Sequence, residues 1–293
     1  MALSQSKIWI LAARPKTLPA ATAPVIIGCA LAWGAEAFHL PAALAALAGA
    51  LLIQIGTNFA NDYFDFLQGI DDHERLGPMR VTQAGLVSPR KMKRATIMVF
   101  GLALLVGVYL VWRGGWPVVI IGLLSILFGV LYTGGPYPLG YNGLGDVFVL
   151  IFFGPVAVGG TYFVQALDIS APVLIAGFAP GLFSVAILTV NNLRDLDNDR
   201  AAGKRTLAVR FGKSFTVAEY VACIVIACAI PVVLYLAYDV GAKVLIASAT
   251  LLFAVPTVKD VCSKSGVVLN ETLAATGRLL FLFSILFSVS WLL

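Results

Sequence analysis

The sequence predicts an all-α integral membrane protein with about nine transmembrane helices in a single domain, residues 1–293. Of the 293 residues, 60% are hydrophobic and only 12% are charged. A soluble domain is usually about a quarter charged. In addition, no polar stretch between the apolar segments is long enough to form a soluble domain of its own. These observations exclude a soluble globular protein.

The predicted spans follow from the length of each apolar run. A helix needs about 20 mainly apolar residues to cross the bilayer core. The runs that meet this requirement are residues 18–36, 40–62, 95–113, 116–134, 145–166, 171–191, 216–238, 241–258 and 274–293. The first run follows basic residues, as the apolar part of a signal peptide does. It lacks a convincing cleavage site, so we expect a retained helix.

The distribution of Lys and Arg predicts the orientation of these spans. Eighteen of the 20 basic residues precede the first span or lie in loops on the same side, and only Arg113 and Lys243 lie on the other side. Because loops rich in Lys and Arg stay in the cytoplasm, we expect the N-terminus and both long polar loops to be cytoplasmic. The basic residues lie beside the membrane rather than on a separate domain, so we expect no nucleic-acid partner.

Two acidic motifs open the long polar loops. "NDYFDFLQGID" begins at Asn61 and contains Asp62 and Asp65, spaced i, i+3; "NNLRDLDND" contains Asp195 and Asp199, spaced i, i+4. On a continued helix each pair shares one face, where two like charges require a cation. Mg²⁺ suits such pairs because it binds through one or two carboxylates together with substrate phosphates. Both motifs lie on the same predicted side, so they could hold two Mg²⁺ ions around a diphosphate.

Basic residues lie close to both acidic motifs and could complete an anion site. The candidates for contact with diphosphate oxygens are Arg14, Lys16, Arg75, Arg80 and Lys204. Such residues can also serve topology alone, which is the interpretation that we favour for the more distant Lys91, Lys93 and Arg94. The four cysteines lack CxxC spacing and there are only two histidines, so we expect neither a disulfide nor a Cys/His metal site.

The two motifs resemble the paired Asp-rich motifs of the UbiA superfamily of intramembrane prenyltransferases. Three further stretches resemble the bacterial branch that acts on 1,4-dihydroxy-2-naphthoate in menaquinone biosynthesis. These are "RPKTLPAATAPVIIG", "NDYFDFLQGIDDHERLGPMRVTQAGLVSPRKMKRA" and "YNGLGDVFVLIFFGPVAVGGTYFVQ". The resemblance covers nearly the whole chain and is weakest in the last three spans.

The resemblance implies nine helices around a central cavity that is capped by cytoplasmic loops 61–94 and 191–215, in a bacterial plasma membrane. It implies Mg²⁺-assisted transfer of a polyprenyl chain from its diphosphate to the naphthoate, with loss of CO₂. By position, Asp62 and Asp65 would hold one Mg²⁺ and Asp195 and Asp199 the other. The supporting residues would be Asn61 and Asn192.

One position departs from the general superfamily pattern. The pattern places a third acid four residues after the second, where this sequence has Gly69. The acid falls instead at Asp71, as it does in the naphthoate branch. The shift favours that branch over 4-hydroxybenzoate enzymes and makes Asp71 a candidate catalytic residue whose role is open.

Two alternatives remain at this point. The acceptor could be another aromatic compound, either 4-hydroxybenzoate or homogentisate. The protein could also be an ion-coupled secondary transporter, although transporters place ionisable groups near the bilayer midplane and the acids here gather at one face. The sequence indicates neither the length of the prenyl chain nor the oligomeric state.

Overall fold

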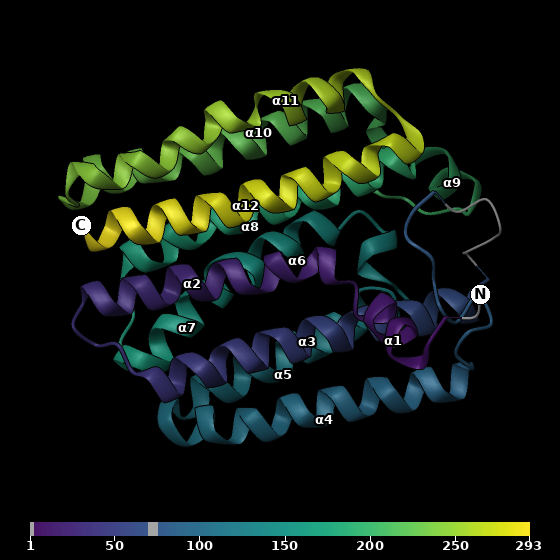
Figure 1. Cartoon of the computed structure of the whole chain (residues 1–293), viewed down its shortest axis with the longest axis horizontal. Coiled ribbons are helices and arrows are strands. Elements are labelled where there is room, and N and C mark those ends of the chain that lie inside the picture. The colour runs from purple at the N-terminus through teal and green to yellow at the C-terminus, as the bar shows by residue number, and fades with distance from the viewer. Residues whose placement is uncertain (1–2, 70–75) are drawn as a thin grey trace.

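In the computed structural model, which describes residues 3–69 and 76–293, every regular element of the described chain is a helix. Most helices run side by side along the long axis of the molecule (Figure 1). In chain order they are α1 Gln5–Ala13, η1 Pro15–Thr17, α2 Leu18–Gly34, α3 Leu40–Leu67, α4 Pro89–Gly114, α5 Trp116–Leu131, η2 Leu139–Tyr141, α6 Gly145–Ile151, η3 Phe152–Val156, α7 Ala157–Ala166, α8 Ala171–Arg194, α9 Leu196–Ala201, α10 Leu207–Tyr238, η4 Ala242–Ala249, α11 Thr250–Ser263, η5 Gly266–Val268 and α12 Leu269–Leu292.

The predicted arrangement of about nine spans is confirmed within the described residues. Eight helical segments are long and apolar enough to cross a membrane, and a shorter apolar helix, α5, stands where the span 116–134 was predicted. The main differences lie at the helix ends: α3 continues to Leu67, and α10 begins at Leu207 with a break in helical geometry at Gly212. The length of an apolar run shows only which part of a helix lies in lipid. The backbone hydrogen bonds of the helix can continue beyond that run into polar residues, so the helices are longer than the predicted spans.

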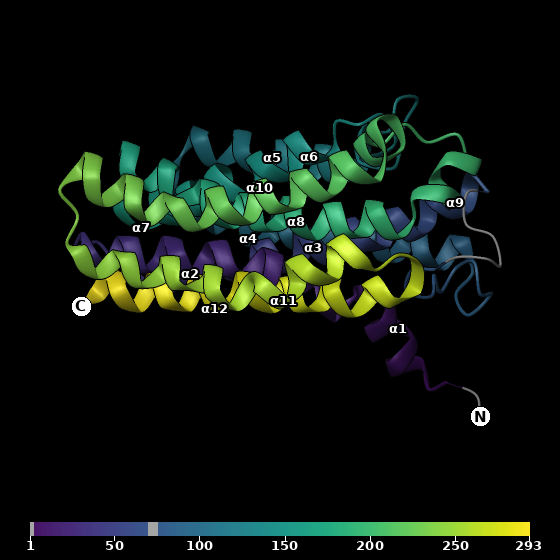
Figure 2. The same cartoon turned by 90° about the horizontal axis from the view of Figure 1, so that it is seen from above.

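Helix α1 was not predicted because it is too short to form a span by itself. Its N-terminal cap is Ser4, whose hydroxyl accepts a hydrogen bond from the N–H of Lys7. The helix projects away from the bundle axis (Figure 2) and buries Ile8 and Ala12 in a small apolar cluster with Val81 of the loop between α3 and α4. Helix α1 therefore supports that loop.

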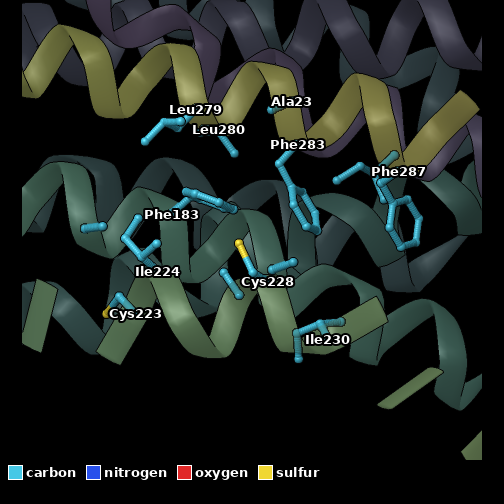
Figure 3. Close-up of a cluster of buried hydrophobic side chains, with 14 of the residues drawn as sticks. Ala23, Phe183, Cys223, Ile224, Cys228, Ile230, Leu279, Leu280, Phe283 and Phe287 are labelled. Atoms are coloured by element: carbon cyan, nitrogen blue, oxygen red, sulfur yellow. The ribbon is translucent and has the colours of Figure 1, made fainter. Parts of the chain in front are cut away.

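The main apolar core surrounds α8. Phe183 of α8 packs against Phe283 of α12, with ring centroids 5.3 Å apart, and Ile224 and Cys228 of α10 lie in the same cluster (Figure 3). Cys223 of α10 is buried in this cluster as well. Because neighbouring helices enclose α8, its C-terminal end, which carries the second acidic motif, has a fixed position.

The fifth span is interrupted in the middle. Residues 152–156 form a π-helical turn between α6 and α7, with non-helical geometry at Gly154 followed by Pro155. A Cβ at Gly154 would lie 2.8 Å from the carbonyl oxygen of Gly177, so the absence of a side chain lets α8 approach closely. Such π-turns are frequent at functional sites, and Phe152 and Phe153 of this turn line the cavity described below.

The two ends of the bundle carry different polar groups. Helix α1, helix α9 and the loop between α3 and α4 lie at one end (Figures 1 and 2). Near the opposite end, Arg113 donates hydrogen bonds to the carbonyl oxygens of Val164 and Gln165, at 2.6 and 2.9 Å. Lys243 donates to the carbonyl oxygen of Leu293. Both acidic motifs therefore occupy the same end of the molecule.

Candidate active site

A cavity of about 1070 Å³ runs between α3, α4, α5, the broken α6–α7 span and α8. Its wall is polar at the end where the acidic motifs lie and apolar along the helices. Along α3 the lining extends from Ala46 to Asp65, and these 19 steps of about 1.5 Å cover roughly 28 Å of helix. The cavity therefore joins a charged end to an apolar chamber nearly as deep as the bilayer core.

Asp65 lies on the last full turn of α3 and faces the polar end of the cavity. Its side chain is buried and forms an ion pair with the guanidinium of Arg80, which comes from the loop before α4. The Tyr141 hydroxyl donates a second hydrogen bond to the same carboxylate. In the structure the Asp65 carboxylate is therefore paired with Arg80, one of the predicted diphosphate-binding cations.

Asp62 lies one turn earlier on α3 and has different surroundings. It is 2% exposed, and it does not line the cavity. One carboxylate oxygen accepts the N–H of Val81 at 3.0 Å, and the other accepts the N–H of Thr82 at 3.1 Å. Its partners are therefore backbone amides of the loop that carries Arg80.

Asp195 lines the cavity where α8 ends. The Nε of Arg194 lies 2.8 Å from its Oδ1, and the same guanidinium donates to the side-chain oxygens of Asn191 and Asn270 at 2.8 Å each. Asn270 in turn donates to the carbonyl oxygen of Leu76 at 2.9 Å. Asp195 is therefore held by a polar network that joins α8, α12 and the loop between α3 and α4.

Asp199 faces the cavity from the short helix α9. Its N–H bonds to the carbonyl oxygen of Asp195 at 2.7 Å, which preserves the i, i+4 relation across the helix break. Lys204 places its Nζ 2.8 Å from the Asp199 carboxylate and 4.9 Å from the centre of the Tyr141 ring. Asp197 lies between Asp195 and Asp199 in the sequence but points away from the cavity, with a side chain 90% exposed.

The other predicted site residues fall into three groups. Asn61 and Asn192 line the cavity, and the Asn61 oxygen accepts a 2.8 Å hydrogen bond from Thr133. Arg14 also lines it, from a left-handed backbone position (φ 52°) just after α1. Lys16 is exposed and outside the lining. Arg75 and Asp71 lie outside the described residues.

Several residues of the site were missed by reasoning from the sequence. Arg194 is one of the eighteen basic residues on the predicted cytoplasmic side, and nothing in the sequence singles it out although it lies within the second motif between Asn191 and Asp195. Tyr141 and Asn270 carry no charge and lie far from the motifs in sequence, so no local pattern marks them. They enter the site only because η2 and α12 pack beside the ends of α3 and α8.

The apolar part of the cavity contains a group of aromatic rings. Phe128 of α5 packs against Phe148 and Phe152 of the broken span, with ring centroids 4.6 and 5.5 Å apart. Tyr132 also lines the cavity.

The donors at the polar end fit Mg²⁺ bound together with a substrate. Within residues 3–69 and 76–293, no three His, Cys, Asp or Glu side chains form a group that could hold a metal ion. The lining instead offers single carboxylates and amide oxygens from two sides of the cavity: Asp65, Asn61, Asp195, Asp199 and Asn192. A hard cation that keeps several waters and takes phosphate oxygens as ligands suits such a set.

The sequence profile of the UbiA prenyltransferase family matches residues 21–265. The chain belongs to this family. Among relatives, 1,4-dihydroxy-2-naphthoate octaprenyltransferase of Escherichia coli (strain K12) is 42% identical over 76% of this chain and 74% of its own length. The enzyme of that name from Haemophilus influenzae is 35% identical over 98% of this chain and 96% of its own length.

The UbiA fold is also found among solved structures. A UbiA homolog from Archaeoglobus fulgidus bound to GPP and Mg²⁺ superposes with a TM-score of 0.69, covering 97% of this chain and 99% of its own. The two sequences are only 14% identical, so the likeness concerns the fold. The family predicted from the motifs is thus confirmed by the sequence comparisons, and the predicted fold is confirmed by the structural one.

Proposed function

We propose that this UbiA-family protein transfers a polyprenyl chain from polyprenyl diphosphate to 1,4-dihydroxy-2-naphthoate, with loss of CO₂, in menaquinone biosynthesis. The observation that carries the proposal is one continuous cavity that joins acids and cations at one end to an aromatic, apolar chamber. The relatives named as naphthoate octaprenyltransferases support the choice of acceptor. Their name specifies an octaprenyl donor, which favours a long donor for this protein as well but does not determine its exact length.

The polar end of the cavity would bind the diphosphate with its magnesium. Asp65, Asp195 and Asp199 would supply carboxylate ligands, with Asn61 and Asn192 beside them, and we propose two ions. Bound there, magnesium would neutralise negative charge on the diphosphate. Arg80, Lys204 and Arg14 would contact the remaining phosphate oxygens through charge-assisted hydrogen bonds. We keep Arg75 as a candidate for contact with the diphosphate and Asp71 as a candidate catalytic residue.

The first chemical step breaks the bond between the prenyl carbon and the bridging diphosphate oxygen, and the bonding electrons leave with the diphosphate. Donors that are already in place stabilise the charge that develops, and loss of one such donor typically costs about 10²–10³-fold in rate. The allylic cation left behind needs an environment without water. Phe128, Phe148 and Phe152 supply apolar walls, and their ring faces can stabilise a cation.

The second step forms the new carbon–carbon bond. The electron-rich ring of the naphthoate attacks the allylic cation, and the carboxyl group leaves as CO₂ while its bonding electrons restore the aromatic ring. Attack through the carboxylated carbon therefore releases CO₂ in place of a proton. This balance requires no general base, in keeping with the small number of histidines in the chain.

The membrane arrangement belongs to the same proposal. The apolar helices make the chain a multi-pass membrane protein. We place the N-terminus and the acidic motifs on the cytoplasmic face of a bacterial plasma membrane, because basic residues gather at that end. Loops 61–94 and 191–215 would cap the cavity there.

A direct assay tests the proposed acceptor. The purified protein, in lipid nanodiscs with Mg²⁺ and one polyprenyl diphosphate, is offered 1,4-dihydroxy-2-naphthoate, 4-hydroxybenzoate or homogentisate in separate reactions. We expect prenylated product with the naphthoate and one CO₂ per product. Transfer to one of the other acceptors in preference would replace our assignment, whereas no transfer to any acceptor would contradict prenyl transfer itself.

A further inference from the structure

We infer that Asp62 is a positioning residue that holds the Arg80 loop in place, rather than a direct ligand of magnesium. The inference rests on the proposed function, because it gives the two acids of the first motif different roles in the same reaction: Asp65 would bind magnesium, and Asp62 would position Arg80. Asp65 faces the cavity, whereas Asp62 lies behind it on α3 with both carboxylate oxygens bound to the loop.

The loop that Asp62 holds is a compact unit. The N–H groups of Ala84, Gly85 and Leu86 bond to the carbonyl oxygens of Arg80, Thr82 and Val81, at 2.9 to 3.0 Å. Gly85 adopts a left-handed conformation (φ 70°) that favours glycine. Because the unit is closed by its own hydrogen bonds, holding Val81 and Thr82 also sets the position of the neighbouring Arg80.

Besides the ion pair of Arg80 with Asp65, two contacts attach this unit to the protein. Asp62 accepts both backbone N–H groups, which is a charge-assisted arrangement. The Val81 side chain is fully buried in the apolar cluster with Phe59, Met92 and Ile8. Both contacts act on Val81, and the charged contact also holds its neighbour Thr82, so loss of either one should release the same unit.

The consequence of this attachment is the placement of Arg80. Its guanidinium pairs with Asp65 at the polar end of the cavity, where it would meet the diphosphate. The side chain is 8% exposed, so it reaches that position only while the loop stays packed against α3. Asp62 thus acts on the reaction through Arg80 and not through the metal.

The test compares Asp62→Asn and Val81→Ala with Asp65→Asn in the full-length protein in nanodiscs. An Asn side chain has only one acceptor oxygen and presents an N–H to the second loop amide, so the attachment is weakened. Val81→Ala removes the apolar contact and leaves the Asp62 carboxylate intact. Thr82→Val is the matched control, because it keeps the backbone N–H, and within the described chain the buried Thr82 hydroxyl has no hydrogen-bond partner.

Three measurements separate the roles. Bound Mn²⁺ ions are counted by electron paramagnetic resonance, trypsin cleavage after Arg80 is followed by fragment mass, and KM for the prenyl diphosphate is measured separately from kcat. We expect Asp62→Asn and Val81→Ala to bind as many Mn²⁺ ions as the parent. Both variants should be cleaved faster and should raise KM about tenfold or more. Asp65→Asn should lose Mn²⁺, and Thr82→Val should match the parent.

The inference is overturned if Asp62→Asn loses a Mn²⁺ ion as Asp65→Asn does, or if its loop stays as resistant to trypsin as the parent loop. It is also overturned if Val81→Ala leaves both cleavage and KM unchanged. Ion counting and cleavage do not depend on the acceptor. A failure of the proposed transfer reaction would therefore appear as an inactive parent protein, while these two measurements would still judge the role of Asp62.

Discussion

Arg194 and Asp195 are neighbours in the sequence and form an ion pair at the end of α8, with Nε 2.8 Å from Oδ1. The Arg194 side chain is completely buried, whereas the Asp195 side chain keeps 15% of its surface. The open side of the carboxylate faces the cavity. A buried cation therefore fixes this acid from behind and leaves it accessible from the front.

Replacing Arg194 should damage both stability and turnover. Arg194→Ala leaves Asp195 without its cation and removes the donors to Asn191 and Asn270. Removing one partner of a buried pair usually costs about 3–5 kcal/mol, so we expect a clearly lower thermal midpoint in detergent together with loss of transfer activity. Arg194→Lys should recover part of the stability, because an ammonium keeps the charge but cannot bridge the same set of oxygens.

Arg200→Ala provides the matched control for Arg194. Arg200 pairs with Asp197 at 3.3 Å, but both side chains are largely exposed. Exposed pairs contribute about 0–1 kcal/mol, so this variant should unfold and react like the parent. Equal losses in the Arg200 and Arg194 variants would contradict the distinction between the two arginines.

Tyr141 offers a second prediction, because its hydroxyl and its ring have separate contacts. The hydroxyl donates to Asp65, and the ring lies under the Lys204 ammonium. Tyr141→Phe should keep the fold and the ring contact while removing a donor from the site, which predicts a fall in kcat of about 10²-fold. Tyr141→Ala should in addition raise KM for the prenyl diphosphate by releasing Lys204.

Steady-state kinetics with varied prenyl diphosphate checks this prediction. Tyr137→Phe is the control, since Tyr137 is exposed and does not line the cavity. If Tyr141→Phe kept the kcat of the parent, the hydroxyl contact with Asp65 would have no part in the reaction.

The spans and the two acidic motifs were predictable from the sequence because each is a local pattern. Apolar length marks a membrane helix wherever it packs, and spacing places Asp195 and Asp199 together on one side. The contacts that distinguish Asp62 from Asp65 were not predictable. They depend on a loop whose docking is decided by Val81 and by packing against α1. Likewise, Asn270 reaches the site only because α12 packs beside α8.

Removal of divalent metal should abolish activity, and Mg²⁺ should restore it. Asp199 faces the cavity beside Lys204, so Asp199→Asn removes a negative ligand while keeping an oxygen. We expect this variant to need a higher Mg²⁺ concentration for half-maximal activity and to lose about 10²–10³-fold in kcat. Asp197→Asn is the control, because that side chain points into solvent. Transfer that continued in excess EDTA would contradict a metal-dependent reaction.

Two glycines should leave space in the cavity for a long prenyl donor. Gly107 of α4 and Gly122 of α5 both line the cavity, and a Cβ at either position would meet no atom within 4 Å. Leu104, Val108 and Leu123 line the same region while remaining 49%, 65% and 55% exposed, so the chamber reaches the outer surface between the two helices. Gly107→Leu or Gly122→Leu should therefore fill space without disturbing the fold.

We expect these two variants to lose about tenfold or more in kcat/KM with a long polyprenyl diphosphate, because filling an apolar pocket by even one methylene discriminates by 10–200-fold. Geranyl diphosphate, which is short, should react nearly as well as with the parent. The control is Gly101→Leu, also on α4 and also open at its Cβ position, but outside the cavity lining. Parallel assays measure kcat/KM with the long donor and with geranyl diphosphate. An equal loss with both donors would mean that the substitutions disturb folding or the chemical step rather than the space for a long prenyl chain.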